Sequence, residues 1–320
     1  MICTKRAKNI YLLILIIVQS VSSCSVTSIS TDRKNKEITI SGLQAKGYNI
    51  TNHLQPRQFE GHNDEELQRV CIEGNDTIPS WCFSMIPTLT GVTLANQVSI
   101  VEDNAFYACK QLKHINLDNI VRCGENSFKM TALDTVNLKK CKYVDDFAFS
   151  NCEKLKTVNF SSSLKKIGDF SFYADSSLIA IEIPTGEIGN SCFMGCGNLK
   201  EVALDKVTRL GEASFMGCSA LVDVRLSKGI KIIEPMTFQD CASLNSIVLP
   251  EGIEYIAENA FQGTGLTKVT IPSSVKEIKS QAFANCIFLK AVTICNKNTV
   301  VSHDAFDENV IIEYKKKLKL

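Results

Sequence analysis

A phenylalanine that recurs at a nearly constant interval constrains the fold of this chain more than any other feature. Successive members of the series are separated by 21, 22 or 23 residues: Phe83, Phe106, Phe128, Phe149, Phe172, Phe193, Phe215, Phe238, Phe261, Phe283 and Phe306. Such a period is typical of a solenoid, because each repeat is too small to bury its own apolar face and must stack on its neighbours. The unbroken period therefore predicts one elongated array, although 320 residues would otherwise suggest two domains.

A short strand is predicted in each repeat. Most of the phenylalanines are followed six residues later by a leucine and then by an apolar pair, as in Leu178, Ile181 and Ile183. Spacing by two with frequent β-branched residues indicates a strand with one buried face. The pattern begins near Leu67, and a last, degraded strand is expected at 310–312. The residues five and eight positions before the phenylalanine are mostly apolar and are expected to face inward, and a small residue usually comes just before the ring.

The repeat resembles that of the BspA-like leucine-rich repeat family. The segment from Leu266 to Cys286, LTKVTIPSSVKEIKSQAFANC, follows the family pattern almost position for position, and the resemblance covers residues 67–312. It implies a β-rich repeat solenoid of about eleven 21–23-residue coils with a parallel sheet on one face. It also implies a secreted or surface protein of a bacterium or protozoan parasite, with some members linked to adhesion, and it is nearly silent on the ligand.

The fourteen cysteines fit the repeat better than they fit a disulfide framework. Most fall at inward positions, where a free thiol behaves as a small buried hydrophobe, so we expect a ladder of thiols that fills space. Cys71 and Cys295 lack a clear inward position, and a bridge that involves one of them or Cys24 remains an alternative.

Neither a metal nor a cofactor is expected. No C-x-x-C pair occurs, and the four histidines have no ligand spacing: His53, His62, His114 and His303. A net charge of +1 gives no global electrostatic case for nucleic acid as a partner.

The N-terminus has the form of a signal peptide over residues 1–23. Basic residues precede the apolar run 10–18, and small residues follow it. An uncleaved signal anchor is the alternative, although the run is short for a membrane span. The segment from Val21 to Cys24 also resembles a bacterial lipobox, so lipidation of Cys24 and plain cleavage near Ser23 both remain open. The protein is accordingly expected to be secreted or at the cell surface, with membrane contact only through a lipid on Cys24.

Two polar segments flank the array. Residues 24–66 are predicted to form an N-terminal cap over the first coil or a flexible stalk, with one strand at Glu37 to Ser41. Residues 313–320 are predicted to be a basic, solvated tail that protects the terminal edge.

The outward residues of the predicted strands form the candidate binding face, because alternate side chains of a strand point to opposite sides. The predicted face residues are Thr93, His114, Asn116, Asn137, Asn159, Glu182, Arg225 and Lys268. For the three asparagines we favour mutual hydrogen bonding along the stack. The face lacks the aromatic clusters that usually carry interface energy, which leaves glycan or weak multivalent contacts open.

Three sequons are glycosylation acceptors if the organism is eukaryotic: those at Asn49, Asn75 and Asn159. A glycan on Asn159 would cover the centre of the predicted face.

No catalytic motif is present, and outward carboxylates are scattered without pairing, so an enzyme is not expected. The sequence predicts a non-catalytic, adhesin-like recognition module, secreted or tethered at the surface, that presents a rigid sheet to an unidentified protein or glycan. The alternative is a structural surface spacer, or a lipoprotein without a specific ligand.

Overall fold

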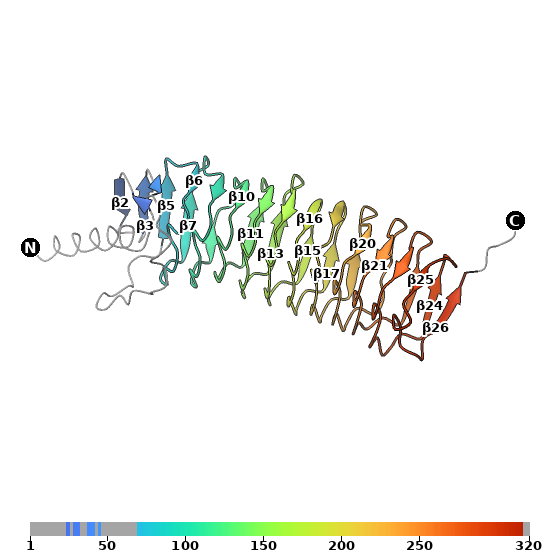
Figure 1. The fold of residues 1–320 in the computed structure, drawn as a ribbon. Coiled ribbons are helices and arrows are strands. Elements are labelled where there is room, and N and C mark those ends of the chain that lie inside the picture. Colours follow the sequence, from blue (N-terminus) through green and yellow to red (C-terminus); the bar gives the residue numbers. More distant parts are fainter. Residues whose placement is uncertain (1–23, 26–27, 33–36, 42–43, 46–68, 316–320) are drawn as a thin grey trace, which may run out of the picture.

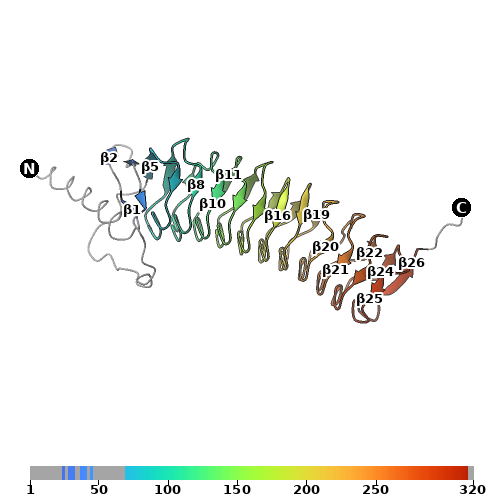
Figure 2. The same cartoon turned by 45° about the horizontal axis from the view of Figure 1, so that its top comes forward.

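The chain forms an elongated stack of coils. A computed structural model describes residues 24–25, 28–32, 37–41, 44–45 and 69–315. The described residues form strands and turns and contain no helix. About eleven coils, each roughly 22 residues long, lie side by side from the blue end to the red end of Figure 1, and the rotated view of Figure 2 shows the same order. This arrangement confirms the solenoid that the phenylalanine period predicts.

The predicted strands line one side of the array, which we call the long-strand face. Its strands in the repeats are β5 (Arg69–Glu73), β7 (Gly91–Leu94), β9 (His114–Ile115), β11 (Thr135–Leu138), β13 (Thr157–Phe160), β15 (Ala180–Glu182), β17 (Glu201–Ala203), β19 (Asp223–Arg225), β22 (Lys268–Ile271), β24 (Ala291–Ile294) and β26 (Ile311–Tyr314). Neighbouring strands pair in parallel, so equivalent residues of successive coils stand next to each other. The hydrogen-bonded ladder is interrupted, because β9 does not pair with β11, nor β13 with β15.

Further parallel strands, which the sequence pattern does not predict, cover another side of every coil, and they form one seven-stranded and one four-stranded sheet. We call this side the short-strand face, and its strands are β6 (Thr77–Ile78), β8 (Ile100–Val101), β10 (Arg122–Cys123), β12 (Tyr143–Val144), β14 (Lys166–Ile167), β16 (Gly186–Ile188), β18 (Val207–Arg209), β20 (Ile232–Ile233), β21 (Tyr255–Ile256), β23 (Glu277–Ile278) and β25 (Val300–Val301). Except at β18, these strands contain the inward position five residues before the phenylalanine of their coil. Runs of two or three residues are too short for a sequence pattern to reveal, so only the stacking of coils makes these sheets recognisable.

The recurring phenylalanines form one continuous column inside the coils. From Phe83 to Phe283 each ring is at most 2% exposed. Successive rings stack with centroids 5.0–5.7 Å apart and planes within 3–16° of parallel. The backbone ties the column together, since the N–H of Phe106, for example, donates to the carbonyl of Ser127 in the next coil (2.8 Å). The predicted inward position of the phenylalanines is therefore confirmed.

The twelve cysteines from Cys71 to Cys295 are free thiols, and ten of them are buried. Cys109, Cys152 and Cys196 each donate the thiol proton to the carbonyl of the phenylalanine one coil earlier, at 2.9–3.1 Å. Burial raises the pKa of the Cys109 thiol to about 12, which keeps it protonated as a donor. The thiols thus fill space as the sequence predicts, and they also satisfy backbone carbonyls.

The segment before the array contributes strands to the long-strand face. The predicted strand is present as β3 (Glu37–Ser41), which pairs in parallel with β5 and antiparallel with β2 (Ser28–Asp32). In addition, β1 (Cys24–Ser25) pairs antiparallel with β4 (Gln44–Ala45). The predicted signal peptide lies outside the described residues. At the other end β26 extends to Tyr314, two residues past the expected end of the array, and residues 316–320 of the predicted tail also lie outside the described residues.

Candidate binding face

The predicted face residues all lie on the long-strand face or directly beside it. Seven of them are exposed, and Asn137 is half-buried. The parallel register places them in two rows along the array. One row contains Asn137 next to Asn159, and Glu182 in line with Arg225 across β17. Lys268 stands apart on β22, beyond a coil that has no strand on this face.

Asn116 ends its strand and opens the sheet. Its Oδ1 accepts the N–H of Leu94 (2.7 Å), and its Nδ2 donates to the carbonyl of the same residue (2.8 Å). The side chain therefore takes the place that a continuing backbone would occupy beside β7. The strand β9 accordingly ends at Ile115, and on its other side it does not pair with β11.

A hollow of about 570 Å³ lies where β9 and β11 are unpaired. We call it the first hollow. Its polar lining comprises Thr93, Lys113, His114, Asn116, Asp118, Asp134, Thr135 and Asn137. Cationic, anionic and amide groups thus converge on one opening, which suits a ligand with several hydrogen-bonding groups.

A second hollow of about 450 Å³ lies over β13 to β19, where β13 and β15 are unpaired. Its polar and charged lining comprises Thr157, Asn159, Glu182, Glu201, Asp223 and Arg225. Three carboxylates and one guanidinium give it a more acidic character than the first hollow. The two hollows differ in charge, so a ligand that contacted both would bind in one preferred orientation along the array.

A pair of amides joins the linings of the two hollows. Asn159 Nδ2 donates to Asn137 Oδ1 at 2.6 Å. The expected mutual bonding of the asparagines is therefore present between these two, whereas Asn116 turns to the backbone of Leu94 instead. The row of three amides is consequently not continuous.

Several lining residues were not among the predicted face residues. Lys113, Asp118 and Asp134 come from the turns beside the strands, whose outward position cannot be read from a strand pattern. Glu201 and Asp223 do stand in a strand row, just before an inward residue, so their position was recognisable. Their contribution depends on the break between β13 and β15, which the sequence does not indicate.

The predicted modification sites fall in different places. Asn159 is exposed on β13, Asn75 is half-buried, and Asn49 lies outside the described residues. Cys24 is in β1, but the placement of its side chain is not described. Among the residues that the structure describes, no three His, Cys, Asp or Glu side chains form a group that could hold a metal ion. The same residues contain no helix of sufficient length and hydrophobicity to span a bilayer.

Comparison with known proteins settles the family. The model of the BspA type leucine-rich repeat region, in six copies, matches residues 76–200 and 186–313, which is more than half of the chain. The chain belongs to the BspA-type leucine-rich repeat family. The resemblance seen in the repeat pattern is thereby confirmed, and the two hollows lie on the leucine-rich repeat strands of this array.

Solved structures support the same fold. A leucine-rich repeat protein from Bacteroides ovatus is 21% identical with a TM-score of 0.56, and the match covers 91% of this chain and 99% of that one. The pneumococcal vaccine antigen PcpA is 18% identical with a TM-score of 0.51, and the match covers 93% of this chain and 87% of that one. The comparison with curated proteins finds no match. At these identities the likeness establishes the fold alone.

Proposed function

We propose that this leucine-rich repeat protein is a non-catalytic, adhesin-like recognition module, secreted or tethered at the cell surface, which binds a protein or glycan through its long-strand face. The observation that carries the proposal is the pair of hollows on that face, lined by the outward polar side chains of β7 to β19. Leucine-rich repeat folds generally bind proteins or other ligands, and the family is typically non-catalytic.

The mechanism is rigid display. The buried phenylalanine column and the in-register backbone fix the strands, so the outward side chains lose little conformational freedom when a ligand binds. The second hollow offers Glu182 and Arg225 on neighbouring sides of one opening. Such opposite charges suit a ligand with both donor and anionic groups, and they give specificity through complementary placement.

A paired charge-reversal experiment tests the proposal. The double variant Glu182→Lys/Arg225→Glu changes the face without changing the net charge. The matched control Glu258→Lys/Lys228→Glu makes the same exchange at exposed positions away from both hollows. Each protein is applied to a glycan array and to an array of purified extracellular-matrix proteins.

We expect the wild type and the control to bind the same spots, and the face variant to bind them at least tenfold more weakly. A structural spacer, which has no ligand, would give either no specific spot or spots that both variants retain. Circular dichroism and thermal unfolding show whether both variants keep the fold.

A further inference from the structure

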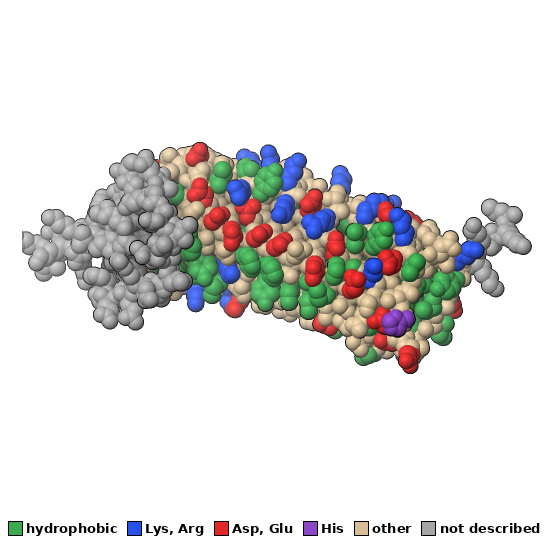
Figure 3. All heavy atoms as spheres, viewed as in Figure 1, with side chains coloured by type: hydrophobic (Ala, Val, Ile, Leu, Met, Phe, Trp, Pro, Cys, Tyr) green, Lys and Arg blue, Asp and Glu red, His purple; other side chains and the backbone are tan. Residues whose placement is uncertain are grey.

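Basic side chains gather on the short-strand face and its adjoining turn, away from both hollows. We call this set the basic patch, and its six members are all exposed: Arg122, Lys139, Lys140, Lys142, Lys165 and Lys166. Figure 3 shows Lys and Arg side chains clustered along the upper part of the surface, over the green coils of Figure 1 that carry β10 to β14. None of these residues lines either hollow.

The parallel register arranges the basic patch in rows along the array. Arg122, Tyr143 and Lys166 are in register on β10, β12 and β14. The N–H of Lys165 donates to the carbonyl of Lys142 (2.8 Å), which places these two lysines on neighbouring coils. Adjacent coils are about 4.8 Å apart in the hydrogen-bonding direction, so the positive charges repeat at short intervals parallel to the solenoid axis.

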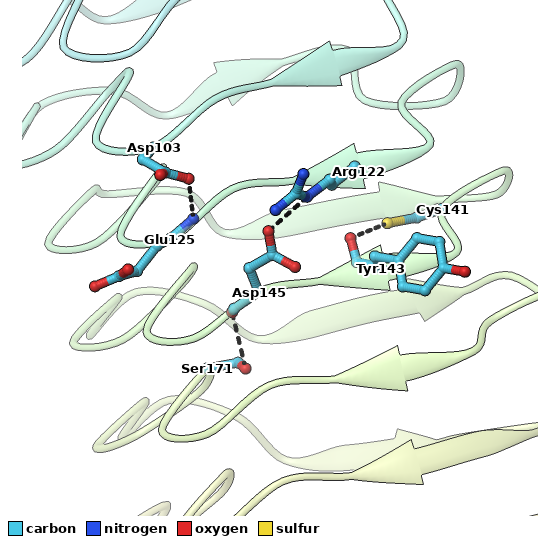
Figure 4. Close-up of polar contacts among 7 residues, drawn as sticks. All are labelled: Asp103, Arg122, Glu125, Cys141, Tyr143, Asp145 and Ser171. Carbon is cyan, nitrogen blue, oxygen red and sulfur yellow. Dashed lines mark hydrogen bonds and ion pairs between the residues drawn. The ribbon is translucent and has the colours of Figure 1, made fainter.

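Acidic neighbours neutralise only part of this charge. Arg122 Nε contacts Asp145 Oδ2 at 2.6 Å, as Figure 4 shows, and Lys139 Nζ contacts Asp118 Oδ1 at 2.7 Å. Glu187 stands in register beside Lys166. The carboxylates of Asp103 and Glu102 also act on Arg122, so the positive charge that is left belongs to the lysines of the patch.

Four lysines carry most of the uncompensated charge. Within the described part of the chain, Lys140, Lys142, Lys165 and Lys166 take part in no ion pair, and Lys140 donates to the neutral Asn119 Oδ1 at 2.7 Å. The whole chain has a net charge of only +1, so the positive excess is a local feature of these coils. A local excess of this kind attracts anions at short range.

We propose that the basic patch binds a linear, sulfated polysaccharide that lies along the solenoid axis. Rows of lysines match a polymer with anionic groups at regular intervals, and the exposed Ser162 lies in the turn three residues before Lys165. A single-stranded nucleic acid usually needs several aromatic side chains on which successive bases stack. Tyr143 is the one aromatic residue within these rows, which favours the polysaccharide.

Binding of heparin, a sulfated polysaccharide, to the full chain tests this assignment. The variant Lys142→Glu/Lys165→Glu/Lys166→Glu reverses three of the four patch lysines that form no ion pair. The control Lys200→Glu/Lys228→Glu/Lys297→Glu makes the same charge change at exposed lysines outside the patch. Titration calorimetry at several salt concentrations gives the affinity and its salt dependence, and circular dichroism verifies that both variants remain folded.

We expect the patch variant to bind heparin at least tenfold more weakly and with a shallower salt dependence, while the control stays within twofold of the wild type. Desulfated heparin should bind the wild type more weakly than heparin. Equal losses in the two variants, no heparin binding by the wild type, or tighter binding of single-stranded DNA than of heparin would each overturn the assignment. The face variant Glu182→Lys/Arg225→Glu should keep its heparin affinity, which separates this surface from the long-strand face.

Discussion

At the scale of single residues, a buried row of side chains beside the phenylalanines donates hydrogen bonds to backbone carbonyls inside the coils. The residue three positions after each phenylalanine is most often Cys or Thr, and its Sγ or Oγ donates to a phenylalanine carbonyl, as in Cys196 (3.1 Å) and Thr131 (2.9 Å). Asp175 occupies the same position and is completely buried. Its Oδ1 accepts the N–H of Cys152 at 2.8 Å, whereas its Oδ2 has no hydrogen-bond partner. This carboxyl is therefore an exception within an otherwise neutral row.

The stability of the protein should fall with rising pH because of Asp175. Burial raises the pKa of this carboxyl well above its usual range, and the N–H of Cys152 opposes the shift. The folded state thus holds a proton that the unfolded state releases above about pH 4. The contribution of Asp175 to stability is greatest below that pH, and it is lost as the pH rises through the folded pKa of this carboxyl.

The variant Asp175→Asn cannot ionise and should remove this loss. We expect it to be more stable than the wild type by about 1–3 kcal/mol at pH 7, with a smaller gain at pH 5. Urea unfolding at pH 5, 7 and 8 measures the difference. A variant whose deficit relative to the wild type grew with pH would contradict the assignment of the proton to Asp175.

At the scale of elements, the length of each strand depends on side chains that compete with the backbone. Asn116 ends β9 through its two hydrogen bonds to Leu94, and the first hollow opens beside it. In the coil of residues 244–249 no strand forms on the long-strand face, and Val248 is 81% exposed there. The face is accordingly divided into short paired segments, and the hollows lie at two of the divisions.

Removal of the Asn116 amide should destabilise this part of the sheet. Asn116→Ala leaves the N–H and carbonyl of Leu94 without their partners, so we expect a loss of about 1–3 kcal/mol in the free energy of unfolding. Hydrogen exchange of the Leu94 amide should become faster, while the amide of Val158 on β13 serves as the internal control. Unchanged protection of Leu94 would mean that the side chain does not hold the strand.

At the scale of the whole molecule, each coil depends on its two neighbours. Rings from Phe83 to Phe283 are almost completely buried, and those from Phe106 to Phe283 have a stacked ring on each side. Phe306 in the last coil stacks on Phe283 and is only partly buried. Stability of such an array is approximately a sum of coil and interface contributions. A defect in the middle therefore affects two interfaces, and a defect at the end affects one.

Loss of a central ring should separate the array into two unfolding units. We expect Phe193→Ala to cost about 3–5 kcal/mol and Phe306→Ala distinctly less. Hydrogen exchange should show lost protection on both sides of residue 193 in the first variant, and only in the last coils in the second. Equal costs and uniform loss of protection in both variants would argue against nearest-neighbour stacking.

Much of the repeat architecture could be predicted because it depends on local periodicity. The phenylalanine interval predicted the solenoid, and the leucine pattern predicted strands such as β11 and β22. The positions of Cys109 and Cys152 within the repeat predicted that their thiols are buried. The strand at Glu37–Ser41 was also recognisable from its alternation. Each of these features depends on which side chains avoid water, and that preference is readable in one coil at a time.

The sequence by itself determined which residues of each coil point inward and which point outward, because burial of apolar side chains imposes a fixed order along every repeat. Only the tertiary structure decided where neighbouring strands pair and where they separate. That choice depends on contacts between coils about 22 residues apart, such as the amide of Asn116 on Leu94 and the register that brings Lys142 beside Lys165. The hollows and the basic patch arise from those contacts, so they become visible only when the coils are stacked.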